Sequence, residues 1–350
     1  MPPAVTLPVA PPLDPMLARA AEQIPAGPGW RYEPKWDGFR AIVFRDGAEM
    51  HVASRNGQPL QRFFPEILDP LRAALPAAAV VDGEIIIATP RGLDFDALQM
   101  RLHPAASRVA RLAGETPATV ILFDLLGEGS DDLRGRPLVT RRELLLGAVT
   151  ANARVALTPQ TADLDEAADW FTRYEGAGLD GIIAKPEDST YRSGERGWTK
   201  VKHLRTADCV VGGYRLGVKG DGVGSLLLGL YDRDGVLHLA GHTSSFSAPE
   251  RRDLVRLLEP LTGGESFGHG RTPGAPSRWS GGKDAAWTAV KPELVCEVSF
   301  DHLQGQRFRH AARFLRWRDD REPSTCTFDQ LTPADAFRLG DIVDLPDAQG

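Results

Sequence analysis

The apolar and polar positions of the first two hundred residues predict a mixture of strands and helices. Phe39–Phe44 and Glu49–Ser54 are strand-like runs on either side of a good turn sequence, Arg45-Asp46-Gly47, and indicate a hairpin. Short apolar or β-branched runs typical of buried strands follow at Val80–Thr89, Val120–Leu126 and Gly181–Ala184. Apolar residues at helical spacing predict helices at Phe64–Leu75, Asp94–Leu102, Thr140–Val149 and Asp163–Tyr174.

The order of these elements narrows the fold class. Strands seldom alternate with single helices here, so an antiparallel or mixed sheet is expected rather than a doubly wound parallel one. Asp163 is a suitable N-cap for the last helix, with Glu166 three residues later as in a capping box. This part of the chain is therefore predicted to be α+β.

The pattern changes after about Arg205. Glycine turns separate strand-like segments at Asp208–Tyr214, Ser225–Tyr231, Val236–Gly241 and Leu294–Phe300, with a weaker candidate at Arg307–Trp317. One helical segment, Ala248–Leu261, interrupts them, and Gly263–Lys283 has the composition of a surface loop. About five strands with one helix is the pattern of a small Greek-key β-barrel such as the OB-fold. The chain is therefore predicted to form two domains, residues 1–205 and residues 206–350.

Length and composition agree with this division. The chain has 350 residues, enough for roughly two domains of about 150 residues each, and 42% of them are hydrophobic. It contains neither an apolar run of about 18 residues nor the pattern of a signal peptide. We therefore expect a cytoplasmic location and no membrane association. The cysteines are scattered and form no CxxC pair, which disfavours a zinc site or disulfides: Cys209, Cys296 and Cys326.

Charge is distributed unevenly. The net charge is −6, from 41 basic and 47 acidic residues, which argues mildly against a general polyanion binder. Gln306–Arg321 nevertheless contains six arginines and only two acids. A local basic surface fits nucleic-acid binding, although a solvated strand with interspersed charge would give the same pattern.

The candidate chemistry begins in the hexapeptide Lys35–Arg40, with sequence KWDGFR. It places an amine two residues from the Asp37 carboxylate and five from the Arg40 guanidinium. A lysine amine is a strong nucleophile only when it is unprotonated, and neighbouring cations favour that form. The same cations would bind a phosphate. Six residues alone would occur by chance in many chains.

Further charged residues lie at the ends of the predicted strands. They are Ser54-Arg55-Asn56-Gly57, Asp82-Gly83-Glu84, Phe123-Asp124, the segment Asp180–Lys185 and the segment Trp198–Lys202. Each has an ordinary structural explanation: two lysines at strand spacing are usually a solvated face, and Phe123 could be plain core. Together they supply cations for phosphates, carboxylates for a divalent metal and an aromatic face for a base.

In this order and spacing the six elements resemble the nucleotidyltransferase motifs of the covalent lysyl-nucleotide superfamily, which comprises DNA ligases, RNA ligases and mRNA capping enzymes. The chain is most similar to the ATP-dependent DNA ligases, in particular the short bacterial type called ligase C in mycobacteria. The resemblance runs from Met16 to about Thr327. It implies an α+β nucleotidyltransferase domain with an ATP-grasp-like antiparallel sheet, followed by a C-terminal OB-fold β-barrel.

The resemblance also implies roles for the residues that match the family's motifs. Lys35 would take AMP from ATP as a phosphoramidate. Glu33 would help to read the adenine amino group, and Phe123 would stack on the adenine. Arg40 and Arg55 would lie near the ribose and phosphates.

The remaining matches concern the ribose, the metal and the phosphates. Glu84 would bind a ribose hydroxyl and, with Asp180, form the metal site for Mg²⁺ or Mn²⁺. Asp180 stands where the family usually has glutamate, so direct ligation could become water-mediated. The resemblance gives phosphate binding to five cations, which are Lys185, Lys200, Lys202, Arg316 and Arg318. In the last motif Asp320 is retained, and Arg321 replaces the usual lysine with a different geometry.

The implied activity is the sealing of a nick between a 3′-hydroxyl and a 5′-phosphate through lysyl-AMP. Nicked double-stranded DNA is the implied partner, with a DNA-repair protein as a further one. A monomer associated with the nucleoid is expected. Only 34 residues precede Lys35, so recognition of the nick is expected to depend on the two domains or on a partner.

Two alternatives stay open at the level of sequence. A GTP-using capping-type or RNA-joining enzyme has related motifs, although the full set and the C-terminal motif favour DNA. A non-catalytic binding module could keep the fold, but loss of Lys35 or of the paired lysines would be expected for it. Gly220–Gly224 and Gly281–Asp284 look like phosphate loops; the first precedes a strand and predicts a hairpin, and the second lacks a complete Walker motif.

Overall fold

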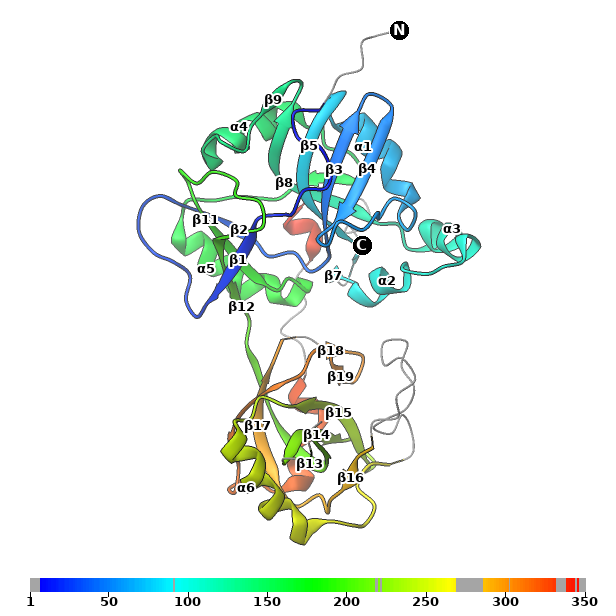
Figure 1. The fold of residues 1–350 in the computed structure, drawn as a ribbon, viewed down its shortest axis with the longest axis vertical. Helices are drawn as coiled ribbons and strands as arrows, with labels where there is room; N and C mark the ends of the chain where they lie inside the picture. Colours follow the sequence, from blue (N-terminus) through cyan, green and yellow to red (C-terminus); the bar gives the residue numbers. More distant parts are fainter. Residues whose placement is uncertain are drawn as a thin grey trace. The chain divides into compact units, whose positions relative to one another are not determined.

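The computed structural model describes residues 7–345 except 91, 218, 219, 221, 269–285, 302, 332–337 and 344. Its contacts divide the chain into two compact units. The first comprises Met1–His203 together with Ala334–Gly350, and the second comprises Leu204–Pro333. Each unit is drawn in Figure 1 with its own sheets and helices.

The first unit contains two main sheets. One has the order β1 (Leu17–Ala21), β12 (Arg196–Lys202), β11 (Gly181–Pro186) and β2 (Trp30–Pro34). The other has the order β10 (Val155–Leu157), β8 (Thr119–Glu128), β5 (Ala78–Ile86), β3 (Phe39–Asp46) and β4 (Glu49–Ser54), with β9 (Asp131–Asp132) also paired to β8. β6 (Ala88–Thr89) and β7 (Gly92–Leu93) form a small separate hairpin. The pairs β1–β12 and β8–β10 are parallel and the others antiparallel, so the predicted mixed α+β architecture is confirmed.

Helices cover these sheets. They are α1 (Leu68–Ala74), α2 (Phe95–Met100), α3 (Ala106–Glu115), α4 (Leu138–Ala148) and α5 (Leu164–Arg173), with 3₁₀ turns at Pro65–Ile67 and Tyr174–Ala177. α4 packs against β8, and α5 packs against β2 and β11 (Figure 1). The Asp163 carboxylate accepts hydrogen bonds from the backbone N–H groups of Asp165 and Glu166, so the predicted N-cap is confirmed. α3 was not predicted from the sequence; only Val109 and Leu112 of it are buried.

The alternation of side chains along the strands produces cores on both faces of the second sheet. In β3, Ala41 and Val43 join one apolar cluster with the residues under α1 and α2, whereas Ile42 and Phe44 point into another with Trp198. The second cluster also holds Phe123, because β8 contributes residues to both faces. The polar residues at the ends of these strands therefore lie next to an apolar core.

The second unit is built on one five-stranded path. Its order is β15 (Leu237–Thr243), β14 (Val223–Tyr231), β13 (Arg205–Leu216), β17 (Val295–Phe300) and β20 (Arg313–Trp317), and β16 (Thr288–Ala289) pairs with β13. β18 (Leu303–Gln304) and β19 (Arg307–Phe308) form a small hairpin, and α6 (Ala248–Leu258) contacts β14. Turns of 3₁₀ helix lie at Glu259–Leu261, Pro323–Thr325 and Phe328–Leu331.

This sheet is open as far as the described residues go. One isolated bridge joins Thr243 to Ala312, and the Ala312 N–H donates to the His242 carbonyl over 2.9 Å, but no ladder joins β15 to β20. The strand predicted at Arg307–Trp317 is split into β19 and β20 by a segment in which His310 contacts the Asp301 carboxylate over 2.7 Å. The hairpin predicted around Gly220 is confirmed by the antiparallel pairing of β13 and β14. Most of the predicted loop Gly263–Lys283, and all of Gly281–Asp284, lie outside the described residues.

The end of the chain packs into the first unit. A 3₁₀ turn at Leu339–Asp341 introduces four buried side chains: Leu339, Ile342, Val343 and Leu345. They join the cluster that contains Trp36, Trp170 and Ile182. Residues after 333 therefore group with the first unit, whereas the sequence-based boundary placed them in the second. No helix within the described ranges is long and apolar enough to cross a membrane.

Candidate active site

Lys35 follows β2 and is fixed by the backbone of the β11 region. Its N–H donates to the Gly181 carbonyl over 2.8 Å, and its carbonyl accepts from the Asp180 N–H over 2.9 Å. Gly181 has φ +134°, and a Cβ there would lie 2.0 Å from the Val201 carbonyl oxygen, so this close approach requires glycine. The backbone thus holds the Lys35 and Asp180 side chains next to each other.

Asp180 is a shared counter-ion. Its carboxylate is 3% exposed and forms an ion pair with the Lys35 ammonium and another with Lys202, whose Nζ lies 2.9 Å from Oδ2. Lys200 is on the same strand face as Lys202, two residues away. The pKa of Lys200 is lowered by burial first, and then by the charges of Lys202 and Lys35. The predicted nucleophile, Lys35, and two predicted phosphate-binding lysines, Lys200 and Lys202, are therefore brought together around one buried carboxylate.

A second buried ion pair lies beside this group. Lys185 Nζ is 2.7 Å from Glu33 Oε2, and both side chains are almost completely buried. The same ammonium lies 4.6 Å from the Phe123 ring centroid and 4.2 Å from that of Trp198. Burial lowers the pKa of Lys185, against the attraction of Glu33. Lys185 thus contacts both the aromatic ring predicted to stack on a base and the carboxylate predicted to read that base.

Arg40 is anchored by Asp82. Its Nε and Nη2 donate to the two Asp82 carboxylate oxygens over 2.5 and 2.6 Å, and its guanidinium lies 4.6 Å from the Phe123 ring centroid. Glu84 is directly opposite Arg40 across the β3–β5 pair. Gly38 permits this pairing at the end of β3, because a Cβ there would lie 2.2 Å from the Ile85 carbonyl oxygen.

Glu84 titrates far from its ordinary value. Burial raises the pKa of its carboxyl from 4.5 to about 7, although Arg40 and Lys35 oppose the shift. Between these two pH values the folded chain binds more protons than the unfolded chain. The free energy of unfolding is therefore expected to fall by at most about 3 kcal/mol as the pH rises from 4.5 to 7, and to level off above 7.

Urea unfolding at pH 5 and at pH 7.5, without metal, measures this dependence. Glu84→Gln should flatten it, because the amide cannot titrate. A Glu84→Gln chain that loses as much stability over this interval as the unsubstituted chain would contradict the assignment to Glu84.

The other predicted residues are more exposed. Arg55 is exposed, and its charge is among those that lower the pKa of Lys200. In the second unit, Arg316 Nε lies 2.6 Å from Glu297 Oε2. Arg318 donates to both Asp208 and Asp320 over 2.9 Å. Arg316 and Arg318 are thus paired with carboxylates of their own unit.

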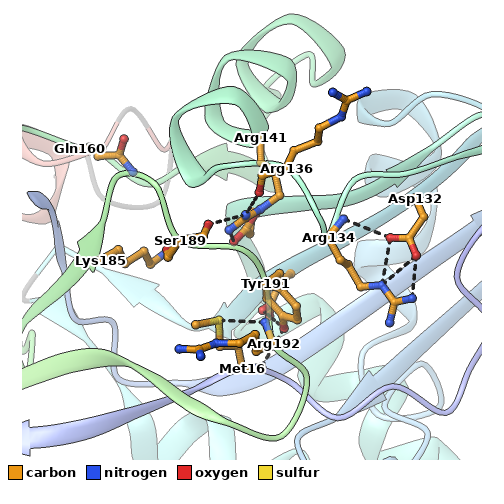
Figure 2. A network of polar contacts seen from close by, with 12 residues as sticks. Met16, Asp132, Arg134, Arg136, Arg141, Gln160, Lys185, Ser189, Tyr191 and Arg192 are labelled. Carbon is orange, nitrogen blue, oxygen red and sulfur yellow. Dashed lines mark hydrogen bonds and ion pairs between the residues drawn. The ribbon is translucent and has the colours of Figure 1, made fainter. Parts of the chain in front are cut away.

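A polar network fixes the connection between β11 and β12, which adjoins the site (Figure 2). Arg141, fully buried, forms an ion pair with Asp124 and donates to the Ser189 carbonyl over 2.9 Å. The Tyr191 hydroxyl donates to Asp82 over 2.6 Å, and it accepts from the Met16 N–H over 2.9 Å. Through Asp82, the β11–β12 connection therefore helps to hold Arg40.

Sequence reasoning missed several residues of the site. Gln160 Nε2 donates to Glu33 Oε1 over 2.7 Å, and Tyr191 and Trp198 border the cluster around Phe123. Arg142, on α4, also carries charge near Glu33. Local sequence offers no signal for Gln160 or Arg142, whereas Trp198 stands in a motif that was recognised for its lysines.

The carboxylates of Glu84 and Asp180 could bind magnesium only together with further ligands. Within the described ranges, no three His, Cys, Asp or Glu side chains gather as a metal site. Mg²⁺ usually takes one or two carboxylates and completes its shell with water and substrate phosphates. Glu84 and Asp180 would supply two carboxylates for such a site if nucleotide phosphates completed the shell.

Comparison with known proteins agrees with this geometry. The family model described as ATP dependent DNA ligase domain matches residues 15–202, and that of the ATP dependent DNA ligase C terminal region matches residues 219–321. DNA ligase C of Mycobacterium tuberculosis is 50% identical over 96% of this chain and 98% of its own length. DNA ligase C2 of Mycolicibacterium smegmatis is 51% identical over 93% and 96%.

A solved structure of a Lig E DNA ligase has the same fold. It covers 87% of this chain and 99% of its own, with a TM-score of 0.54 and 20% identity. Motif residues of the first unit gather around Lys35, and the family models match both units. The chain belongs to the family of ATP-dependent DNA ligases.

Proposed function

We propose that the protein seals nicks in double-stranded DNA through an AMP group carried on Lys35. The observation that carries the proposal is the grouping of Lys35, Lys202 and Lys200 around the buried Asp180 carboxylate. It lies beside the cluster of Glu33, Lys185 and Phe123. A nucleophile, phosphate-binding cations and a base-binding surface are the parts that nucleotidyl transfer needs.

The reaction has three displacements. The unprotonated Lys35 amine attacks the α-phosphorus of ATP, a P–N bond forms, and pyrophosphate leaves. The 5′-phosphate at the nick then attacks the lysyl-AMP phosphorus, which releases the lysine and forms a 5′-adenylated strand. Finally the 3′-hydroxyl attacks the 5′-phosphorus, and AMP leaves as the phosphodiester forms. Positioning and charge stabilisation supply most of the catalysis in such phosphoryl-type transfers.

Asp180 controls the nucleophile in this scheme. An ammonium held by a carboxylate is not nucleophilic, so the Lys35 ion pair must open before attack. Lys202 and Lys200 bind the phosphates. Bound Mg²⁺ or Mn²⁺, held by Asp180 and Glu84, would neutralise phosphate charge. The Asp180 side chain, shorter than the family's usual glutamate, suits contact with such an ion through a water.

The nucleotide would lie across the two ion pairs. Glu33 accepts from the adenine amino group, Phe123 stacks on the base, and Glu84 binds a ribose hydroxyl. Arg40 holds the ribose edge from its fixed position on Asp82. Lys185, which the motif match gives to the phosphates, pairs with Glu33 and lies over the ring of Phe123 in the chain without nucleotide. Arg55 contributes positive charge near the phosphates.

The second unit completes the enzyme. We assign it an OB-fold, on the strength of its five-stranded path with one helix and the match to the ligase C-terminal region. Arg316 and Arg318 would face the pyrophosphate during loading with ATP. Nicked DNA is the macromolecular partner. We assign the protein a role in DNA repair, with a repair protein as a further partner. We expect it to act as a monomer in the cytoplasm, at the nucleoid.

Nucleotide labelling tests the proposal. The chain is incubated with Mg²⁺ and α-labelled ATP, GTP or AMP-labelled NAD in parallel. We expect covalent, acid-labile label from ATP alone, and its transfer to AMP when nicked duplex DNA is added. Label from GTP, or preference for a nick in RNA, would move the assignment to capping-type or RNA-joining enzymes; absence of label from ATP would overturn it.

A further inference from the structure

One segment next to Glu33 lies outside the recognised motifs. Residues 158–161 run beside β2, where the Tyr32 N–H donates to the Thr161 carbonyl over 2.8 Å and the Thr161 N–H returns a bond of 3.0 Å. The Trp36 indole N–H donates to Thr158 Oγ1 over 2.9 Å. These bonds place Gln160 next to Glu33, to which its side-chain amide donates over 2.7 Å.

Arg142, on α4, contacts the same segment, residues 158–161. Its Nη2 donates to the Thr158 carbonyl over 2.6 Å. Its Nη1 is buried and has no hydrogen-bond partner within the described part of the chain. Glu33 and Asp124 are the carboxylates whose charges act on this guanidinium, while burial lowers its pKa. A buried donor without an acceptor destabilises the folded chain, so an acceptor supplied by a ligand would be favoured.

Glu33 keeps capacity for a ligand. An ionised carboxylate offers about four acceptor positions, and Gln160 and Lys185 use one on each oxygen. Residues 158–160 thus contact both an acceptor on β2, Glu33, and an arginine on α4 whose buried Nη1 has no partner within the described part of the chain. The Watson–Crick edge of adenine has the complementary order: the 6-amino group donates and N1 accepts. Guanine has the reverse order, with an acceptor at O6 and a donor at N1.

We propose that Arg142 and Glu33 together read the Watson–Crick edge of the nucleotide base, with Arg142 Nη1 donating to N1 of adenine. Gln160 is a positioning residue that orients the Glu33 carboxylate toward the 6-amino group. The inference rests on the proposed function, because it assigns the base specificity of the same nucleotide site. The Glu33 carboxylate alone would disfavour guanine through repulsion of O6. The Arg142 donor adds a second element of selection, because guanine N1 is itself a donor and cannot accept from it.

The test combines variants with nucleotide analogues. The rate of covalent labelling is measured for the full chain and for Arg142→Ala with ATP and with 1-deaza-ATP, which lacks the N1 acceptor. With ATP, we expect Arg142→Ala to lower kcat/KM about 10- to 100-fold, and 1-deaza-ATP to be about as poor a substrate for the unsubstituted chain. With 1-deaza-ATP the two proteins should then differ by less than about threefold, because the same bond is already missing.

Two further proteins separate base reading from structural damage. Arg111→Ala removes a surface arginine of α3 that pairs with Glu115, and it should behave as the unsubstituted chain with both nucleotides. Gln160→Ala should lose activity with ATP but much less with purine riboside triphosphate, which lacks the 6-amino group.

The outcomes distinguish the two proposals. If ATP gives no label on the unsubstituted chain, the proposed function fails. If ATP labels it and 1-deaza-ATP labels it equally well, only the role of Arg142 fails. An Arg142→Ala defect of the same size with both nucleotides would also overturn the role, because damage to folding would affect both alike.

Discussion

Lys35→Ala is expected to reduce covalent labelling by α-labelled ATP to background, by more than about a thousandfold. The amine is the only group at the end of β2 that can form the phosphoramidate, and its loss removes the bond rather than weakening it. The side chain is 19% exposed and its partner Asp180 keeps the ion pair with Lys202, so the fold should be retained. Gel analysis of labelled protein, with thermal unfolding as a check on folding, measures both quantities.

A nick that already carries a 5′-adenylate sharpens this result. The last displacement does not use the lysine amine, so Lys35→Ala should still seal that substrate while failing on an ordinary nick with ATP. Lys291→Ala, an exposed lysine of the second unit, is the matched control and should label normally. Undiminished label in Lys35→Ala would place the nucleophile elsewhere.

Local patterns predicted the interior of the first unit well, because its central strands are buried on both faces. Val80–Thr89 and Val120–Leu126 correspond to β5–β6 and β8 within a few residues. The edge strands β1 and β2 were missed. Leu17–Ala21 and Trp30–Pro34 have no strong apolar run, and their conformation depends on pairing with β12 and β11, far away in the sequence.

The site shows the same limit. Lys35, Asp180 and Lys202 stand in recognisable motifs, and the structure brings all three together. Arg142 looks like a solvated helix residue in the sequence, and Gln160 like a loop residue. Their positions at Glu33 follow from the docking of residues 158–161 on β2, which is a tertiary contact. No short-range pattern can report it.

The C-terminal segment was unpredicted for a related reason. Residues 339–345 are too few to show helical or strand periodicity, yet they bury four apolar side chains in the first unit. The chain therefore passes from the first unit to the second near Leu204 and returns after Pro333. A boundary drawn from composition alone assigns such a returning segment to the domain that precedes it.

Leu339→Ala is expected to destabilise the first unit by about 2–5 kcal/mol. Leu339 is completely buried in the cluster of Trp36, Trp170 and Ile182, so the substitution leaves a cavity as well as removing apolar contact. For a unit of this size the midpoint of thermal unfolding should fall by roughly 5–15 °C. Scanning calorimetry of the full chain measures the change.

Leu146→Ala is the matched control, because Leu146 lies on α4 of the same unit and is 53% exposed. It should change the midpoint by no more than about 2 °C. Equal midpoints for the two variants would show that the C-terminal segment contributes no packing to this core. A selective effect of Leu339→Ala should also slow labelling by ATP below the melting range. The reason is local: the cluster that Leu339 completes contains Trp36, which follows Lys35 directly and donates a hydrogen bond to Thr158, two residues before Gln160.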